Sequence, residues 1–240
     1  PTPALPTPAL PTPALFDDSA IQLFVEHVLA NEVETLSEIV TEYQEQDIAP
    51  ETLFIQLVAP TARELGEKWS RDECDFVDVT MGVWRLQSLL RSVAARAPAV
   101  AGRNGRTTRA LFTTMPDDQH SLGTLMISEC FLRAGWEVET LIDPLQSDIF
   151  YALQSSMFDV IGLTVTTDHS IGLVPHLLNA MRSASCNPNV AVMIGGPAID
   201  DNRALARTLG ADGTAIDAIA ALELANELVS SGAQRVALAF

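Results

Sequence analysis

Basic residues are scarce in this chain of 240 residues, which has 14 Lys and Arg against 31 Asp and Glu and a formal net charge of −17. Residues 1–62 contain ten carboxylates and no Lys or Arg, and Lys68 is the single lysine. Because nucleic-acid-binding proteins gain most of their affinity by neutralising phosphates with clustered cations, this composition argues against direct DNA or RNA binding. It argues equally against attachment to an anionic membrane surface.

Cysteines and long apolar runs are also few. The three cysteines, Cys74, Cys130 and Cys186, are too far apart for a metal-binding pair motif, and their odd number gives no closed set of disulfides. No stretch approaches the ~18 consecutive apolar residues of a membrane span, and we expect no signal peptide. Since 48% of the residues are hydrophobic, we expect a soluble, cytoplasmic protein of two domains.

The N-terminal part of the chain has a helical pattern. Residues 1–15 repeat PTPAL three times, which predicts an extended polyproline-like arm without a role in the fold. Over residues 16–98, apolar residues recur at helical spacing in four segments, which begin near residues 17, 33, 50 and 75. Pro60 lies inside the third segment and predicts a kink. Short connections favour an antiparallel four-helix bundle.

A different pattern follows residues 97–107, whose Gly, Pro and Asn predict a linker. Short apolar runs then alternate with longer helical stretches, which is typical of a parallel sheet with crossover helices. We therefore predict an α/β, Rossmann-like, doubly wound domain over residues 107–232 with a five-stranded parallel sheet. The expected strands are 109–114, 137–141, 160–165, 190–194 and 213–216, and the expected helices are 122–134, 147–154, 171–182, 202–209 and 218–230.

The loop after the first expected strand reads MPDDQHSLG and carries the most informative residues. His120 follows Asp118 by two residues and precedes Gly123 by three. A neutral imidazole can bind a metal through one nitrogen while the other donates to a carboxylate, and Asp118 is the natural partner. A plain helix start, capped by Asp118, explains the same residues as well. From this loop alone, both interpretations stand.

Two later strand ends favour a ligand site. The third expected strand ends in Thr164-Val165-Thr166, and the fourth ends in Gly195-Gly196. In open parallel sheets the ligand lies at the carboxyl ends of the strands. Hydroxyls at one strand end and bare backbone at the next would line a slot for a flat heterocycle.

Asp118-x-His120-x-x-Gly123, followed by these two strand ends, resembles the cobalamin-binding Rossmann-like domain family. The resemblance implies that His120 is the lower cobalt ligand and that the nucleotide tail of the cofactor enters the slot. The family's usual Ser-x-Leu is replaced here by Thr164-Val165-Thr166, which keeps a hydroxyl. Because His120 could also bind haem iron, a haem-binding redox sensor of the same fold is an alternative.

A four-helix bundle before such a domain also resembles this family, in which it caps the upper face of the corrin ring. Methyl-carrying corrinoid shuttle proteins and cobalamin-dependent light sensors share the architecture. Residues 65–76, LGEKWSRDECDF, resemble the light sensors and imply that Trp69 lies over the upper ligand. A bulky ring there disfavours the methyl shuttle. The light sensors commonly have Glu-His where this chain has Val79 and Thr80, and His27 would be a substitute ligand only if its face turned inward.

A bundle and a cobalamin domain without a helix-turn-helix segment resemble the AerR/PpaA antirepressors of purple photosynthetic bacteria. The resemblance implies a regulator that is not an enzyme, binds adenosylcobalamin or hydroxocobalamin, and contacts a DNA-binding transcriptional repressor. Residues 1–100 hold 16 acidic and 6 basic residues, so we expect an acidic bundle face with Glu34, Glu38 and Glu42 to meet the repressor. Trp84 and Trp136 are interpreted as core or hinge residues.

Overall fold

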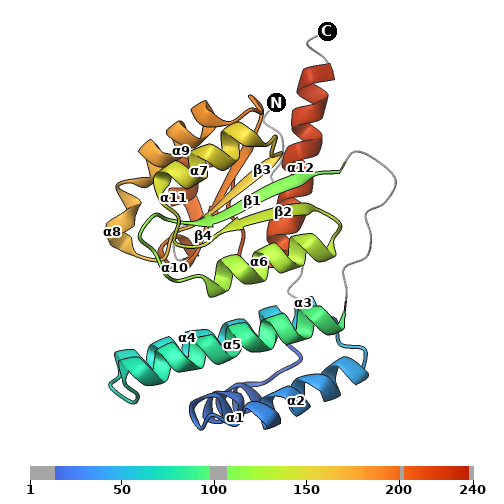
Figure 1. The fold of residues 1–240 in the computed structure, drawn as a ribbon, viewed down its shortest axis with the longest axis vertical. Helices are drawn as coiled ribbons and strands as arrows, with labels where there is room; N and C mark the ends of the chain where they lie inside the picture. Colours follow the sequence, from blue (N-terminus) through green and yellow to red (C-terminus); the bar gives the residue numbers. More distant parts are fainter. Residues whose placement is uncertain (1–13, 98–106, 201–202, 238–240) are drawn as a thin grey trace.

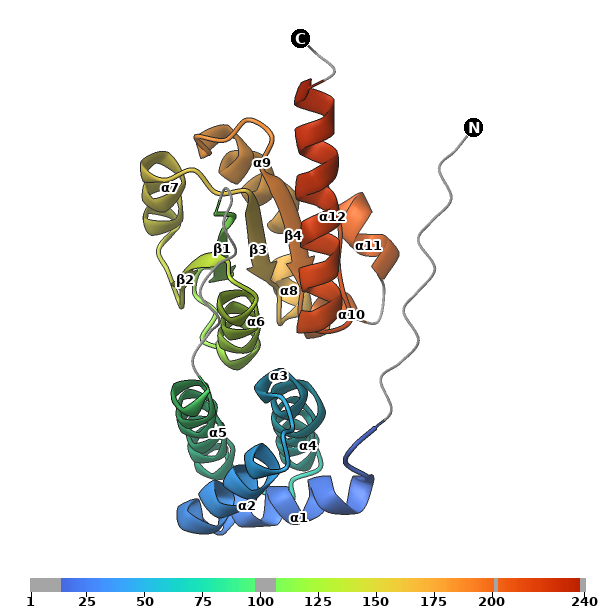
Figure 2. The same cartoon turned by 90° about the vertical axis from the view of Figure 1, so that its right-hand side faces the viewer.

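The computed structural model describes residues 14–97, 107–200 and 203–237. Most of the predicted arm (1–15) and most of the predicted linker (97–107) lie outside the described residues. A helical bundle packs against one side of an α/β domain, as Figures 1 and 2 show. No helix among the described residues is long and apolar enough to span a bilayer.

The bundle begins with two helices whose ends follow from short polar residues. Its elements are α1 (Asp18–Leu29), α2 (Val33–Glu45), α3 (Pro50–Leu53), the π-helical segment η1 (Phe54–Val58), α4 (Ala59–Ser70) and α5 (Phe76–Arg96). Asp17 caps α1 by accepting a hydrogen bond from the Ala20 N–H at 2.8 Å. Asp75 and Asp78 form a reciprocal capping box at the start of α5. Helices α1, α2 and α4 are followed by Asn31, Asp47 and Asp72, which adopt the left-handed backbone conformation that reverses the chain.

The predicted kink at Pro60 takes the form of the π-helical segment η1 directly before it. The Ala59 N–H donates to the carbonyl of Phe54, five residues back. Because Pro60 has no N–H, it cannot continue an α-helical ladder, and the wider turn absorbs the mismatch. α3, η1 and α4 thus act as one irregular helix of the four-helix bundle.

The α/β domain has four parallel strands in the order β2-β1-β3-β4. They are β1 (Arg109–Thr114), β2 (Glu137–Leu141), β3 (Val160–Thr164) and β4 (Ala191–Gly195). The prediction of a fifth strand at 213–216 is wrong. Gly213 forms only an isolated bridge with Met193, because Asp217, four residues later, already caps the last helix and leaves too little chain for a strand.

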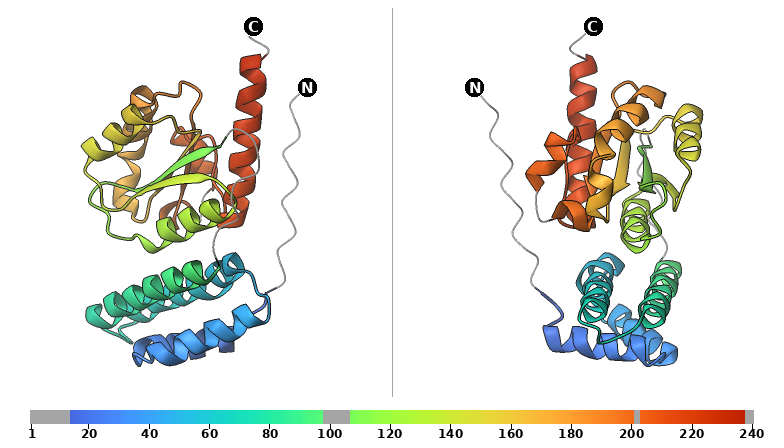
Figure 3. Two further views of the ribbon diagram at one scale, coloured as in Figure 1. Left: turned by 45° about the vertical axis from the view of Figure 1, so that its right-hand side comes forward. Right: turned by 90° about the vertical axis from the view of Figure 1, so that its left-hand side faces the viewer.

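Helices cover both faces of this sheet, as Figure 3 shows from two sides. α6 (Leu122–Arg133) and α12 (Ala218–Ala237) pack on one face, and α7 (Gln146–Ser155) and α9 (Val174–Ala184) pack on the other. The short helices α8 (Asp168–Ile171), α10 (Pro197–Asp200) and α11 (Arg203–Thr208) complete the domain. The helix predicted from residue 171 begins only at Val174, because Pro175 belongs in a first helical turn.

α6 joins the two halves of the molecule. Leu122, Met126 and Cys130, spaced four residues apart, belong to the hydrophobic core of the bundle. Ile127 and Phe131, on another side of the same helix, pack into the core between the sheet and α12. A helix with two apolar stripes must be covered from two sides, so α6 holds the bundle against the α/β domain.

Candidate functional site

The strand order reverses between β1 and β3, and this switch point is where ligands bind in open parallel sheets. The strand register places Thr114, Thr164 and Gly195 side by side in one row at the carboxyl ends of β1, β3 and β4. The loop after β1 carries Asp118 and His120, and Thr166 follows β3. The fold therefore gathers the predicted lower-site residues at one edge of the sheet.

Asp118 and Thr166 hold His120 across this switch point. The Asp118 Oδ1 atom lies 2.7 Å from Nδ1 of His120 and accepts a hydrogen bond from the His120 backbone N–H at 3.0 Å. The Thr166 hydroxyl donates to the other carboxylate oxygen, Oδ2. Asp118 does not cap α6, whose N-cap is Ser121. The carboxylate instead sets the orientation of the imidazole.

The hydrogen bonds also keep Asp118 ionised. Burial of this carboxyl group, which is 8% exposed, would raise its pKa. Hydrogen bonds from the Thr166 hydroxyl and from the backbone and side chain of His120 outweigh this effect, and the pKa of Asp118 is lowered. In a neutral imidazole whose Nδ1–H donates a hydrogen bond to this carboxylate, Nε2 keeps a free lone pair.

That nitrogen is accessible. The His120 side chain is 73% exposed, and its Nε2 makes no hydrogen bond within the described part of the chain. One imidazole held at Nδ1 and open at Nε2 can supply a single ligand to a metal.

The three predicted glycines differ in what surrounds them. A Cβ added at Gly123 or at Gly195 would meet no heavy atom within 4 Å, so open space lies next to both backbones. At Gly196, φ is +107° and a Cβ would lie 2.6 Å from the carbonyl oxygen of Val165. Gly196 is thus required by the turn, whereas Gly123 and Gly195 leave room for a ligand.

A buried hydroxyl group that sequence reasoning missed lies beside Thr164. Thr124 is fully buried in α6, and its Oγ1 is 2.8 Å from the Oγ1 of Thr164. Ser128, one turn later, donates to the Thr124 carbonyl and accepts from Thr140. Thr124 directly follows Gly123, so its position in the loop motif was the available signal.

The upper part of the predicted site is an exposed apolar surface on the bundle. Trp69, in the last turn of α4, is 52% exposed, and Phe76, Val77, Met81 and Trp84 of α5 are exposed too. We call these five residues the apolar bundle surface. Trp84 and Trp136 are predicted to be core or hinge residues. Trp84 is 55% exposed, which excludes a core position, whereas Trp136 is buried at 5% exposure.

The structure does not bring Trp69 into hydrogen-bond or ring contact with the His120 group within the described residues. Val77, Met81 and Trp84 fall at positions i, i+4 and i+7, which form one stripe along α5. In Figure 1, the α4–α5 turn lies on the left, on the same side as the carboxyl end of β1. The α4–α5 turn of the bundle and the ligand end of the sheet thus lie on the same side of the molecule.

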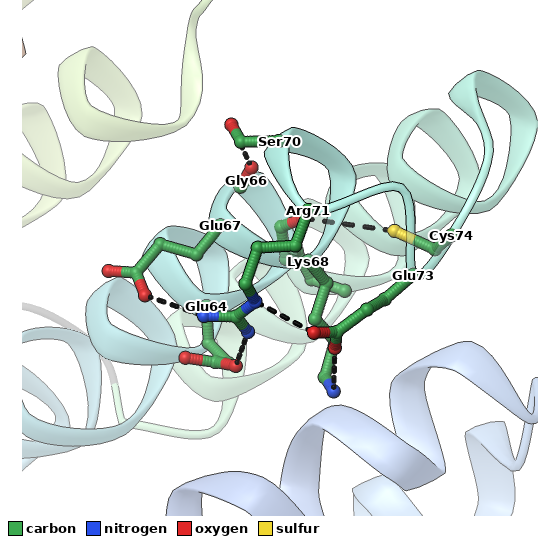
Figure 4. Close-up of polar contacts among 9 residues, drawn as sticks. Glu64, Gly66, Glu67, Lys68, Ser70, Arg71, Glu73 and Cys74 are labelled. Carbon is green, nitrogen blue, oxygen red and sulfur yellow. Dashed lines mark hydrogen bonds and ion pairs between the residues drawn. The ribbon is translucent and has the colours of Figure 1, made fainter.

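Figure 4 shows how the end of α4 that carries Trp69 is fixed. Asp72 and Glu73 donate backbone hydrogen bonds to the carbonyls of Trp69 and Lys68, which is the Schellman arrangement. The Arg71 guanidinium contacts Glu64 and Glu73 at 2.8 Å and Glu67 at 3.3 Å. The pKa of Glu73 is lowered by its hydrogen bonds from Lys68 and Arg71.

Other candidate ligands take local roles. His27 lies 2.5 Å from Glu32 at the α1–α2 turn, and its side chain is 20% exposed. The Thr80 hydroxyl donates to the carbonyl of Phe76 inside its own helix. His169, in α8, is exposed at the ligand end of the sheet. No group of three or more His, Cys, Asp and Glu suited to hold a metal ion occurs among the described residues.

Comparison with known families gives two matches along the chain. Residues 108–223 match a family model described as a B12 binding domain, which covers the α/β part. Residues 20–93 match a second B12 binding domain model, which covers the helical part.

The chain is also similar to individual proteins. An uncharacterized 20.5 kDa protein in the bchF-crtJ intergenic region of Rhodobacter capsulatus is 29% identical over 174 residues, which is 71% of this chain and 88% of the relative. The fold is similar to the monomethylamine corrinoid protein of Methanosarcina barkeri, with a TM-score of 0.69 and 14% identity over 86% of this chain and 96% of that one. A cobalamin-binding protein from Desulfitobacterium hafniense DCB-2 has a TM-score of 0.47 and 15% identity over 87% and 98% of the two chains.

Proposed function

Because the chain belongs to the family of B12 binding domains and its cofactor is cobalamin, we propose that it is a light-responsive regulator rather than an enzyme. In this proposal it is a cytoplasmic antirepressor that acts by protein contact with a DNA-binding repressor of photosynthesis genes. The observation that most supports a cobalamin site concerns His120. Its side chain is exposed and its Nε2 is without a hydrogen bond among the described residues, while Asp118, itself bound by Thr166, fixes the imidazole at Nδ1. The relative in the bchF-crtJ intergenic region supports the regulatory part.

The described residues fit this cofactor. His120 would supply a single imidazole ligand to the cobalt of the cofactor, with Asp118 and Thr166 holding that imidazole in place. Open space beside Gly123 and Gly195 leaves room for the nucleotide tail, and the partly buried hydroxyl of Thr164, held by the fully buried Thr124, can hydrogen-bond to it. When bound as adenosylcobalamin, the cofactor supplies a cobalt–carbon bond that light can break.

The apolar bundle surface would cover the upper side of the ring. Trp69, Trp84 and Met81 are exposed apolar side chains, and a flat apolar ligand would remove them from water. Their contact with the upper group would exclude water from that side. Loss of this group in the light would remove part of the contact, shift the bundle and change the surface offered to the partner.

The proposal is tested by absorption spectra of the protein with adenosylcobalamin, recorded in the dark and after illumination. We expect a spectrum of His-ligated cobalamin in the dark and a changed spectrum in the light. His120→Ala should weaken binding or abolish the His-ligated spectrum, while His176→Ala, an exposed histidine of α9, serves as the control. A light-insensitive spectrum would remove the photochemical role, and normal ligation in His120→Ala would remove the ligand assignment.

The partner contact is assigned to the outer face of α2. Glu34, Glu38, Glu42 and Glu45 are exposed there at intervals of three or four residues, and none has an ion-pair partner among the described residues. Like charges four residues apart destabilise a helix slightly, so local stability does not explain this stripe. A basic DNA-binding surface is complementary to it, and its capture would compete with DNA.

A further inference from the structure

A hydrogen bond connects the bundle to the loop that carries His120. Gln87 of α5 donates from Nε2 to the Oγ of Ser121, and the two atoms are 3.0 Å apart. Ser121 directly follows His120 and is 7% exposed, so the bond lies in a largely buried place at the boundary between bundle and α/β domain. It therefore joins α5 to the backbone next to the metal ligand.

Ser121 gives up a local interaction to make this bond. Ser121 is the N-cap residue of α6, a position where a serine hydroxyl ordinarily accepts a hydrogen bond from the first turn of its own helix. Here its side chain makes no capping hydrogen bond. Its hydroxyl accepts instead from Gln87, 34 residues earlier in the chain. Local helix stability does not account for this choice, whereas a connection between the two domains does.

α5 carries both this bond and much of the apolar bundle surface. Trp84 lies one turn before Gln87, and Met81 and Val77 follow toward the helix start on the same stripe. Because an α-helix moves as a stiff rod over such a distance, a shift of these three side chains also moves Gln87. A conformational change at the apolar bundle surface can therefore be transmitted through α5 to the loop that carries His120.

The other end of α6 has a separate attachment. Arg133 donates from Nε to Glu51 of α3 at 2.6 Å and also donates to the carbonyl of Ala97 at the end of α5. Leu122, Met126 and Cys130 fill the boundary between these two ends of α6. The Gln87–Ser121 bond is thus the polar contact at the end of α6 where His120 lies.

We propose that Gln87 is a positioning residue that couples the bundle to the His120 loop. In this proposal Gln87 keeps α5 at the distance from His120 that the cofactor requires. A displacement of α5 would move the His120 loop, and a displacement of that loop would move α5. The inference rests on the proposed cobalamin function, because it assigns a regulatory contact to the same site. Preorganised contacts on both sides of a ligand raise affinity, so loss of this bond should weaken binding.

The first test needs no cofactor. Gln87→Met keeps the length of the side chain but cannot donate, and Ser121→Ala removes the acceptor. In a double-mutant cycle on urea unfolding of the cofactor-free protein, we expect the double variant to be no less stable than the worse single variant. Gln44→Ala, which removes a glutamine hydrogen bond to Val93 inside the bundle, should add fully to Ser121→Ala. Additive effects of Gln87→Met and Ser121→Ala would overturn the contact itself.

The second test measures coupling. We expect Gln87→Met and Ser121→Ala to raise the Kd for hydroxocobalamin roughly two- to tenfold, as the loss of one partly buried hydrogen bond does, and Gln44→Ala to leave it unchanged. Hydrogen exchange should show that cobalamin protects residues 76–88 in the wild-type protein but much less in Gln87→Met, while residues 118–123 stay protected in both. A merely structural role would lower protection in both segments alike.

The outcomes separate this inference from the proposed function. Failure of the wild-type protein to bind cobalamin would overturn the proposed function and, with it, the coupling. Normal cobalamin binding by the wild-type protein, combined with unchanged Kd and exchange in Gln87→Met, would overturn the coupling alone. If Gln87→Met does not fold, Gln87→Ala is measured in its place against the same expectations.

Discussion

The second hydroxyl of Thr164-Val165-Thr166 has a different partner from the first. Thr164 contacts Thr124 beside the slot, whereas the Thr166 hydroxyl donates to the Asp118 carboxylate that holds His120. Where the resembled Ser-x-Leu motif has leucine, this chain thus has an additional donor behind His120, the proposed metal ligand. A carboxylate with more donors stays ionised and fixed, which keeps the imidazole in one orientation.

Thr166→Val tests this residue-scale role, since it preserves shape and removes the donor. We expect about tenfold weaker binding of hydroxocobalamin, the lower end of what loss of a contact behind a metal ligand causes. Titration followed by absorbance is the measurement. The hydroxyl pair Thr167 and Ser170 lies further along the same segment, and Thr167→Val is the control. If Thr166→Val and the wild-type protein bind hydroxocobalamin with equal affinity, Asp118 alone orients His120 and the Thr166 hydroxyl is not needed.

At the scale of elements, periodicity predicted helix α6 but not what would cover it. The sequence predicts a helix over residues 122–134 without assigning its apolar side chains to a neighbour, and only the structure assigns Leu122 to the bundle and Phe131 to the sheet. Glu129 lies near this boundary, where burial and the negative charge of Glu51 raise its pKa and Arg133 opposes the rise. The folded protein therefore favours the neutral form of Glu129.

A pH dependence follows from this shift. A carboxyl group whose pKa is raised by folding lowers stability as the pH rises above its ordinary value of 4.5. Glu129→Gln should therefore be more stable than the wild-type protein at neutral pH, by on the order of 0.5 kcal/mol. The gain should vanish below about pH 4, where both states are protonated. Urea unfolding at pH 7 and pH 4 measures this gain in the free energy of unfolding, and Glu38→Gln, at an exposed position, is the control. A gain of the same size at both pH values would show that the ionisation of Glu129 is not its cause.

At the scale of the whole molecule, acidic charge is denser on the bundle. Residues 1–100, which include the bundle, hold 16 of the 31 carboxylates and 6 of the 14 cations. The exposed stripe of α2 borders a shallow hollow that includes Arg96, whose guanidinium donates to Ser37 and Thr41. Among the described residues, Arg96 is the one cation that lines this hollow, against four glutamates, so the stripe keeps an excess of negative charge. Long-range attraction of a basic partner is the property that this distribution favours.

Charge reversal tests the partner surface. Changing Glu34, Glu38 and Glu42 to Lys should weaken the repressor complex about tenfold at low salt and much less at high salt, because screening removes the attraction. Unfolding of the variant should change little, since the wild-type residues repel one another. Glu223→Lys with Glu227→Lys, exposed on α12, is the control and is compared with the double variant Glu34→Lys with Glu38→Lys, which reverses the same number of charges. If both sets weaken the complex equally, total charge rather than the α2 face attracts the partner.

The sequence by itself determined the four-helix bundle, the doubly wound domain with four of its strands and the residue types around His120, because apolar periodicity and motif spacing are local properties. Tertiary structure decided the rest. The strand predicted at 213–216 is reduced to a bridge and is followed directly by α12, and Trp84 is exposed because the bundle core is filled by other residues of α5. Gln87 and Ser121 meet only when the chain folds, since their bond depends on how two domains pack rather than on either pattern.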